Sequence, residues 1–256
     1  MMMGLMALAL QTPVPPVTVD RSNAKWGVNY SPERCMITHP FGDGPEASIL
    51  AIDAHPVTGQ GGMVLMLPHV LRRGSMGTAD IAISGHPKLH AQWIAMAGTT
   101  DMAAFRMTVA TSEWPQLVAA DRMTVTGIAD RPVEVPIKGL AKAIDAAKTC
   151  GRALLTSWGA DPDAMIDIGD GEMVAKWIKV DDYPKAALAA NQQGMVKLLL
   201  TIAATGRPTN CKAVVSSRSP FLDSASCRTL MDRAHFAPSP LATRYVYTMV
   251  TWVLPG

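Results

Sequence analysis

The stretch GMVKLLLTIAATGRPTNCKAVVSS, residues 194–217, decides the fold of the C-terminal third of the chain. Apolar and polar residues alternate over 195–203, which is typical of a strand with one buried face. The apolar face carries Val196, Leu198, Leu200 and Ile202, and the other face carries Lys197 and Thr201. Residues 205–208 combine Gly and Pro and predict a turn. Residues 211–216 are predicted to be the return strand.

Two helices and a third strand are predicted around these two strands. Pro184 favours the first turn of a short helix over 185–191. Asp223 is a candidate N-cap for a helix over 224–234. On that helix Cys227, Leu230, Met231 and Ala234 form an apolar stripe at helical spacing. Residues 244–253 alternate as a last strand, so the predicted order is α-β-β-α-β.

The chain has four cysteines, Cys35, Cys150, Cys211 and Cys227, and none forms a CxxC pair. An even count at wide spacing favours two disulfides and an oxidising compartment; four buried free thiols are the alternative. Cys227 faces the predicted sheet and Cys211 lies on a strand face that can meet it. The remaining pair, Cys35 and Cys150, would join an early strand to a helix.

Several short motifs in the C-terminal third resemble a known family. They are Tyr183-Pro184, Gly194-Met-Val-Lys-Leu, Gly206-Arg-Pro-Thr-Asn-Cys, Ser216-Ser217, Leu222-Asp223, Cys227 and Phe236-Ala-Pro. Residues 181–256 resemble the TonB C-terminal domain family, in its two-cysteine, TonB-like periplasmic variant. Arg218 stands where the family usually has Gly after the serine pair, and His235–Ser239 departs from its Arg-Phe-x-Pro-Ala.

The resemblance implies a protein-binding module that adds a partner's extended peptide to an exposed sheet edge. The candidate edge is the last strand, which has no internal Pro and one charge at its start. Its predicted contact residues are Arg244, Tyr245, Val246, Tyr247, Thr248, Met249, Val250 and Trp252. The alternatives are an internal strand, or a strand that pairs with a second copy in a homodimer.

The preceding part predicts a β-rich domain over 23–158. Short apolar runs alternate with Gly- and Pro-rich turns. They cover 26–30, 35–38, 48–54, 62–67, 79–84, 105–110 and 123–127. We expect an α+β protein: an antiparallel sandwich or barrel closed by one helix over 140–158, a solvated linker over 159–180, and the small domain over 181–256.

The N-terminus and the charge bear on location and partners. Residues 1–22 combine a short apolar run with a Pro-rich spacer, and Ala7-Leu8-Ala9 fits a signal-peptide cleavage site. We therefore expect a periplasmic protein, membrane-associated if a start lies upstream with an anchor. Residues 181–256 hold eight Lys/Arg and four Asp. This balance is too weak to indicate nucleic acid.

Candidate chemistry is sparse. His86 and His90 have metal-like spacing, but Pro87 argues against the helix that would make them converge. Ser75 falls one residue short of a nucleophile elbow. The Asp residues of 161–170 lack the third ligand of a calcium loop, because Met165 stands there. We predict no catalytic residue, metal, cofactor or small-molecule substrate.

Three hypotheses remain: a TonB-like protein that binds an outer-membrane transporter or another envelope protein, a non-energising scaffold that self-associates, and a hydrolase in the β-rich domain.

Overall fold

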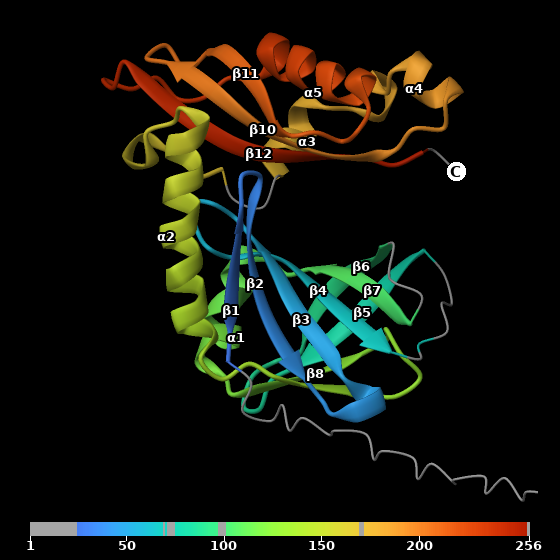
Figure 1. Cartoon of the computed structure of the whole chain (residues 1–256). Helices are drawn as coiled ribbons and strands as arrows, with labels where there is room; N and C mark the ends of the chain where they lie inside the picture. Colours follow the sequence, from blue (N-terminus) through green and yellow to red (C-terminus); the bar gives the residue numbers. More distant parts are fainter. Residues whose placement is uncertain (1–24, 69, 71–74, 97–100, 169–171, 255–256) are drawn as a thin grey trace, which may run out of the picture.

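The computed structural model describes residues 25–68, 70, 75–96, 101–168 and 172–254. It contains two sheets, a large curled one in the N-terminal part and a small one in the C-terminal part (Figure 1). The predicted leader and spacer over 1–22 lie outside the described residues. The α+β class is confirmed: strands dominate and the helices are few.

The N-terminal part is one antiparallel sheet of nine strands in the order β1-β2-β3-β4-β7-β6-β5-β8-β9. It curls on itself rather than forming two packed sheets, and β1 and β9 are its edges. The strands are β1 (Gly27–Ser31), β2 (Arg34–Phe41), β3 (Ser48–Ala54), β4 (Gly61–Pro68), β5 (Met76–Ala82), β6 (Leu89–Met96), β7 (Met102–Thr108), β8 (Arg122–Thr126) and β9 (Val133–Pro136).

Two of these strands, β6 and β9, are missing from the sequence-based prediction. β6 begins two residues after Pro87, so its start resembles a turn, and its outward positions are mixed in character. β9 has only four residues and ends at Pro136. β6 pairs with β5 and β7, and β9 pairs with β8. These cross-strand contacts support strands that their own sequences mark only weakly, because β propensity depends strongly on context. The shorter elements are η1 (Gly44–Glu46), η2 (Thr111–Glu113) and α1 (Trp114–Ala119).

Helix α2 (Leu140–Trp158) closes this part, with the bounds that the periodicity predicts. Leu140, Ile144 and Ala147 are buried against the inside of the curled sheet. Gly151 meets the backbone of Pro56, where a Cβ would lie 2.1 Å from the Pro56 carbonyl oxygen. The helix therefore sits as close to the β3–β4 turn as a backbone allows.

Residues 159–180 differ from the predicted solvated linker. They contain η3 (Pro162–Ala164), α3 (Glu172–Trp177) and the start of η4 (Val180–Asp182). Val174 and Trp177 are buried in the core of the C-terminal part, and the Trp177 ring meets Phe236 at 5.2 Å between centroids. The acidic composition of the segment conceals these apolar anchors, whose burial stabilises the C-terminal core.

The C-terminal part has the predicted α-β-β-α-β order. Its elements are α4 (Lys185–Ala189), β10 (Gly194–Ala203), β11 (Pro208–Val215), α5 (Pro220–Arg233) and β12 (Thr243–Trp252). The sheet order is β11-β10-β12, all antiparallel, so β12 is an edge strand as expected. Val196, Leu198, Leu200 and Ile202 are buried against α5, as the alternation predicts.

The start and the buried face of α5 differ from the prediction. The N-cap is Ser219, whose hydroxyl accepts from the amide of Leu222 at 3.4 Å, and Pro220 occupies the first turn. Asp223 instead accepts hydrogen bonds from the hydroxyl of Ser216 and the amide of Ser217. Of the predicted stripe, Leu230 and Ala234 are buried and Cys227 packs against the core, but Met231 is 36% exposed. The buried face also includes Leu222, Ala225, Ser226 and Thr229.

Both predicted disulfides are present. Cys35 joins Cys150 across 115 residues of chain, and Cys211 joins Cys227 across 16. The first fastens α2 to β2, and the second fastens α5 to β11.

We predict that the two disulfides contribute unequally to stability, because the longer loop restricts the unfolded chain more. Cys35→Ser with Cys150→Ser should lower the free energy of unfolding by about 4–5 kcal/mol. Cys211→Ser with Cys227→Ser should cost about 3 kcal/mol. Urea denaturation of the two double variants measures both values, and a larger loss for the second pair would contradict the ranking.

Candidate functional site

The free edge of β12 is partly covered by the chain itself. Met165 forms a parallel bridge with Tyr245, and the amide of Ile166 donates to the carbonyl of Tyr245 at 2.7 Å. That carbonyl therefore points away from β10. Backbone groups of alternate residues point to the same side of a strand. With the regular β10–β12 register, Tyr247, Met249 and Thr251 then present their backbone groups outward, and the residues between them bond to β10.

The eight predicted contact residues fall into two sets. Val246, Thr248, Val250 and Trp252 turn toward the α5 side and are buried there. Trp252 is a core residue: its indole nitrogen donates to Ser226 at 2.9 Å and its ring packs on Tyr183. Arg244 donates to the Ala237 carbonyl. Tyr245, Tyr247 and Met249 lie on the opposite face of the sheet.

That opposite face packs on the N-terminal part. The Tyr247 ring stacks on Trp158 at 5.9 Å between centroids and meets His55 edge-on at 4.8 Å. Leu199 of β10 is buried with Leu155 and Ala160 at the end of α2. The side chains of β12 are therefore largely used for packing, and beyond Thr248 its exposed parts are the backbone edge and the side chains of Met249 and Thr251.

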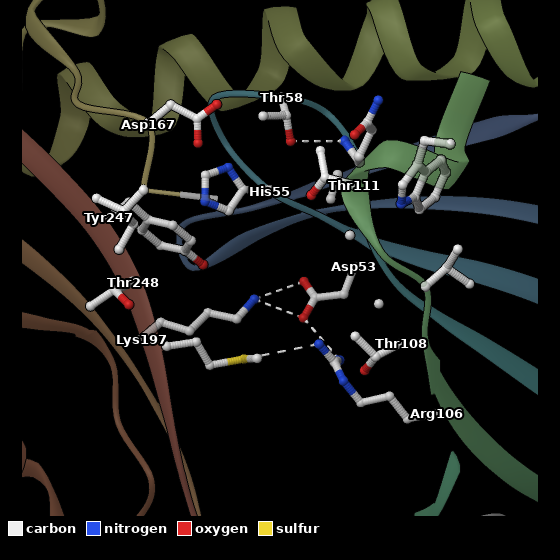
Figure 2. Close-up of a pocket in the computed structure, with 18 residues that line it drawn as sticks. Asp53, His55, Thr58, Arg106, Thr108, Thr111, Asp167, Lys197, Tyr247 and Thr248 are labelled. Atoms are coloured by element: carbon white, nitrogen blue, oxygen red, sulfur yellow. Dashed lines mark hydrogen bonds and ion pairs between the residues drawn. The ribbon is translucent and has the colours of Figure 1, made fainter. Parts of the chain in front are cut away.

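A buried ion cluster joins the two parts (Figure 2). The ammonium of Lys197 on β10 contacts both carboxylate oxygens of Asp53 on β3, at 2.8 and 2.7 Å. A guanidinium nitrogen of Arg106 on β7 lies 3.4 Å from the same carboxylate. The three side chains are 7–10% exposed. Lys197 lies on the polar face that the alternation predicts, but the N-terminal part covers it.

A cavity of about 300 Å³ borders this cluster and the edge of β12. Its lining comes from the β3–β4 turn, β7, α1, residues 167–168, β10 and β12 (Figure 2). His55 and Asp167 lie at one end, and Arg106 lies at the other.

Burial dominates the electrostatics of this region. Desolvation lowers the pKa of Lys197, and the facing Asp53 carboxylate opposes that shift. Desolvation also lowers the pKa of His55 to about 4; Lys197 adds to this shift, while Asp167 and Asp53 oppose it. Burial raises the pKa of Tyr247. His55 is therefore neutral, and Tyr247 protonated, at neutral pH.

Residues 180–254 match the family model described as the Gram-negative bacterial TonB protein C-terminal. The C-terminal domain belongs to this family. The predicted resemblance is thereby confirmed over nearly its full extent, and the TonB C-terminal domain is a periplasmic protein-interaction domain rather than an enzyme fold. No curated protein and no solved structure matches the sequence.

The other candidate sites do not converge. His90 pairs with Asp80 at 2.8 Å, and His86 lies in an exposed turn. Ser75 is exposed before β5. Among the described residues no three His, Cys, Asp or Glu side chains gather as metal ligands. Nor does any helix of the described part have the length and apolar character needed to cross a membrane.

Asp53, His55 and Arg106 are not among the site residues predicted from the sequence. A usable signal exists: Asp53, Arg106 and Lys197 are each a lone charge within an otherwise apolar strand. A buried charge requires a partner, so such positions indicate an ion pair or a ligand. The strand patterns alone do not say which of the three meet.

Asp53 is the only carboxylate in the described cluster of three charges, so its removal leaves two cations facing each other. Asp53→Asn should lower the free energy of unfolding by about 3–5 kcal/mol. Asp80→Asn is the matched control: Asp80 is 39% exposed and pairs at the surface, so its loss should cost less than about 1 kcal/mol. Chemical denaturation at neutral pH measures both, and equal losses would contradict the role of Asp53.

His55 predicts a pH dependence. Its pKa is lower in the folded chain than in the unfolded chain, so its contribution to stability is complete above about pH 6.5. That contribution falls as the pH drops from about 6.5 toward 4, because the unfolded chain binds the proton first. The drop between pH 7 and 4.5 should be smaller in His55→Gln than in the wild type. His86→Gln, an exposed control, should behave as the wild type; equal pH profiles for all three chains would refute the prediction.

Proposed function

We propose that this protein is a periplasmic TonB-like binding protein that adds an extended peptide from an outer-membrane transporter, or from another envelope protein, to the edge of β12. The observation that carries the proposal is the outward-facing backbone of Met249 and Thr251. The described residues offer no hydrogen-bond partner to either. Main-chain hydrogen bonds to such an edge supply affinity with little demand on the partner's sequence.

The proposed location and layout follow from the same features. Two disulfides require an oxidising compartment, which in Gram-negative bacteria is the periplasm. We divide the chain into a β-rich N-terminal domain over 23–158 and the TonB C-terminal domain, and assign the buried residues of α3 to the latter. In this layout the N-terminal domain packs on the face of the small sheet opposite α5, where Trp158 and His55 contact the ring of Tyr247 on the binding strand.

The alternative is a self-associating scaffold. The same edge is free of charge from Tyr245 onward and has no internal Pro, so a second copy could pair with it through a two-fold axis. The two functions separate in solution. A homodimer forms in a concentration-dependent way without peptide, whereas a peptide-binding protein stays monomeric and binds with a one-to-one stoichiometry.

Thr251→Pro tests strand addition, because proline removes one outward amide that β10 does not use. The whole, oxidised chain is titrated calorimetrically with peptides from the periplasmic N-termini of outer-membrane transporters. We expect saturable binding that weakens about 3- to 10-fold in Thr251→Pro, the worth of one main-chain hydrogen bond.

Thr251→Ala is the control at the same position, since it keeps the amide and removes only an exposed side chain. It should bind as the wild type does. Absence of binding by the wild type, or equal affinities for the proline variant and the wild type, would refute strand addition on β12.

A further inference from the structure

Arg106 is a buried cation with few partners. Its side chain is 10% exposed and lines the cavity beside β12. Its contacts are Asp53 at 3.4 Å and the sulfur of Met249 at 3.9 Å. A guanidinium carries five N–H donors, and a thioether is only a weak acceptor. Arg106 therefore has donor capacity that the described residues do not use well.

The charge of the cluster is also unbalanced. Lys197 takes both oxygens of Asp53 at shorter distances than Arg106 does, so this pair is neutral by itself. Arg106 then adds one positive charge to a buried site. Asp167 lies at the opposite end of the cavity, on the side of His55 (Figure 2). Arg106 therefore shares its one close counter-ion in the described part with Lys197. A buried charge that is only partly compensated is costly, and an anion bound beside Arg106 would offset that cost.

The local backbone is shaped around the guanidinium. A Cβ at Gly62 would lie 2.5 Å from the central carbon and from one terminal nitrogen of Arg106. The absence of a side chain at Gly62 leaves room for the planar group to lie against β4 at this point. One terminal nitrogen of the guanidinium lies 3.9 Å from the Met249 sulfur, and a guanidinium can bind a carboxylate through two N–H donors.

Strand addition on β12 would bring a partner side chain to this place. The residue that pairs directly with Met249 projects its side chain on the same face as Met249, with Cβ atoms about 4.5–5.5 Å apart. Lys197 and Met249 lie on that face of the small sheet, and the guanidinium of Arg106 contacts the sulfur of Met249. An acidic side chain at the position opposite Met249 would therefore bring its carboxylate toward the guanidinium of Arg106.

We propose that the cavity is a carboxylate-binding site, with Arg106 as its anion-binding group, and that the carboxylate comes from an acidic residue opposite Met249 in the peptide that pairs with β12. The proposal rests on the function proposed above and adds a selectivity to it. The cavity has a volume of about 300 Å³. This volume is at the lower end of the range of small-molecule sites, roughly 300–1,000 Å³, so the cavity suits a ligand as small as one side chain.

A buried oxygen in the cavity also lacks a donor. The side-chain oxygen of Gln60 is buried there and has no hydrogen-bond partner among the described residues. Since an unsatisfied buried acceptor is unfavourable, a donor from the bound segment would stabilise it. An amide group or a hydroxyl of the bound peptide provides such a donor, whereas an aliphatic side chain does not.

The test is a double-variant cycle on the whole, oxidised chain. A transporter peptide that binds in a Thr251-dependent way is scanned with Glu and with Gln at each position, and affinities are measured for the wild type and Arg106→Gln. At one position Glu should bind about 10-fold more tightly than Gln, and this preference should vanish in Arg106→Gln. Arg122→Gln, an exposed β8 residue outside the cavity lining, should keep the preference.

Arg106→Gln is suited to the test because it leaves the neutral Asp53–Lys197 pair intact, and urea denaturation checks that it folds. Thr251-dependent binding with the same Glu preference in both chains would overturn the carboxylate site and leave strand addition standing. Acetate is the second probe, followed through the Arg106 side-chain NMR signal. An acetate response with no peptide binding would overturn the peptide source, together with the proposed function.

Discussion

The ion pair between Asp53 and Lys197 is the constraint on which the arrangement of the two domains depends. Both groups are buried, and each would be strongly destabilising without the other. A pair of this kind favours one placement of β10 over β3, because a shift that separates the two side chains would leave each buried charge without its partner. The stacked Tyr247 and Trp158 rings then fill the space beside it. The TonB C-terminal domain is thereby held by its open sheet face.

This mode of docking determines which surface remains for a partner. The α5 side of the small sheet is filled by its own helix and by α3, and the other side is covered by the N-terminal domain. The segment around Ile166 takes the first outward carbonyl of β12. What remains with both an outward backbone and an exposed side chain is the strand edge at Met249 and Thr251, next to a cavity with a buried guanidinium. A partner that binds there would contact both domains, so the N-terminal domain can contribute to selectivity.

The sequence predicts local structure better than the contacts between domains. The alternation over 195–203 and the 3.6-residue period over 140–158 locate β10 and α2, because each pattern reports directly which face is buried. The Cys211–Cys227 disulfide follows from faces predicted in the same way, and Cys35–Cys150 is the pair that remains. Asp53 and Lys197 lie 144 residues apart, and no local pattern records that they meet. α3 escapes prediction for a related reason: Trp177 is buried by Phe236, from a distant loop.

Hydrogen exchange of the β12 amides in the unliganded, oxidised chain tests this account most directly. In this account one face of β12 packs on the N-terminal domain and its outer backbone edge is uncovered. The amides of Val246, Thr248 and Val250 then exchange slowly because they bond to β10. Those of Met249 and Thr251 exchange rapidly, since they point to solvent. Slow exchange at both sets of positions would mean that another segment already covers the edge, and would contradict β12 as the binding strand.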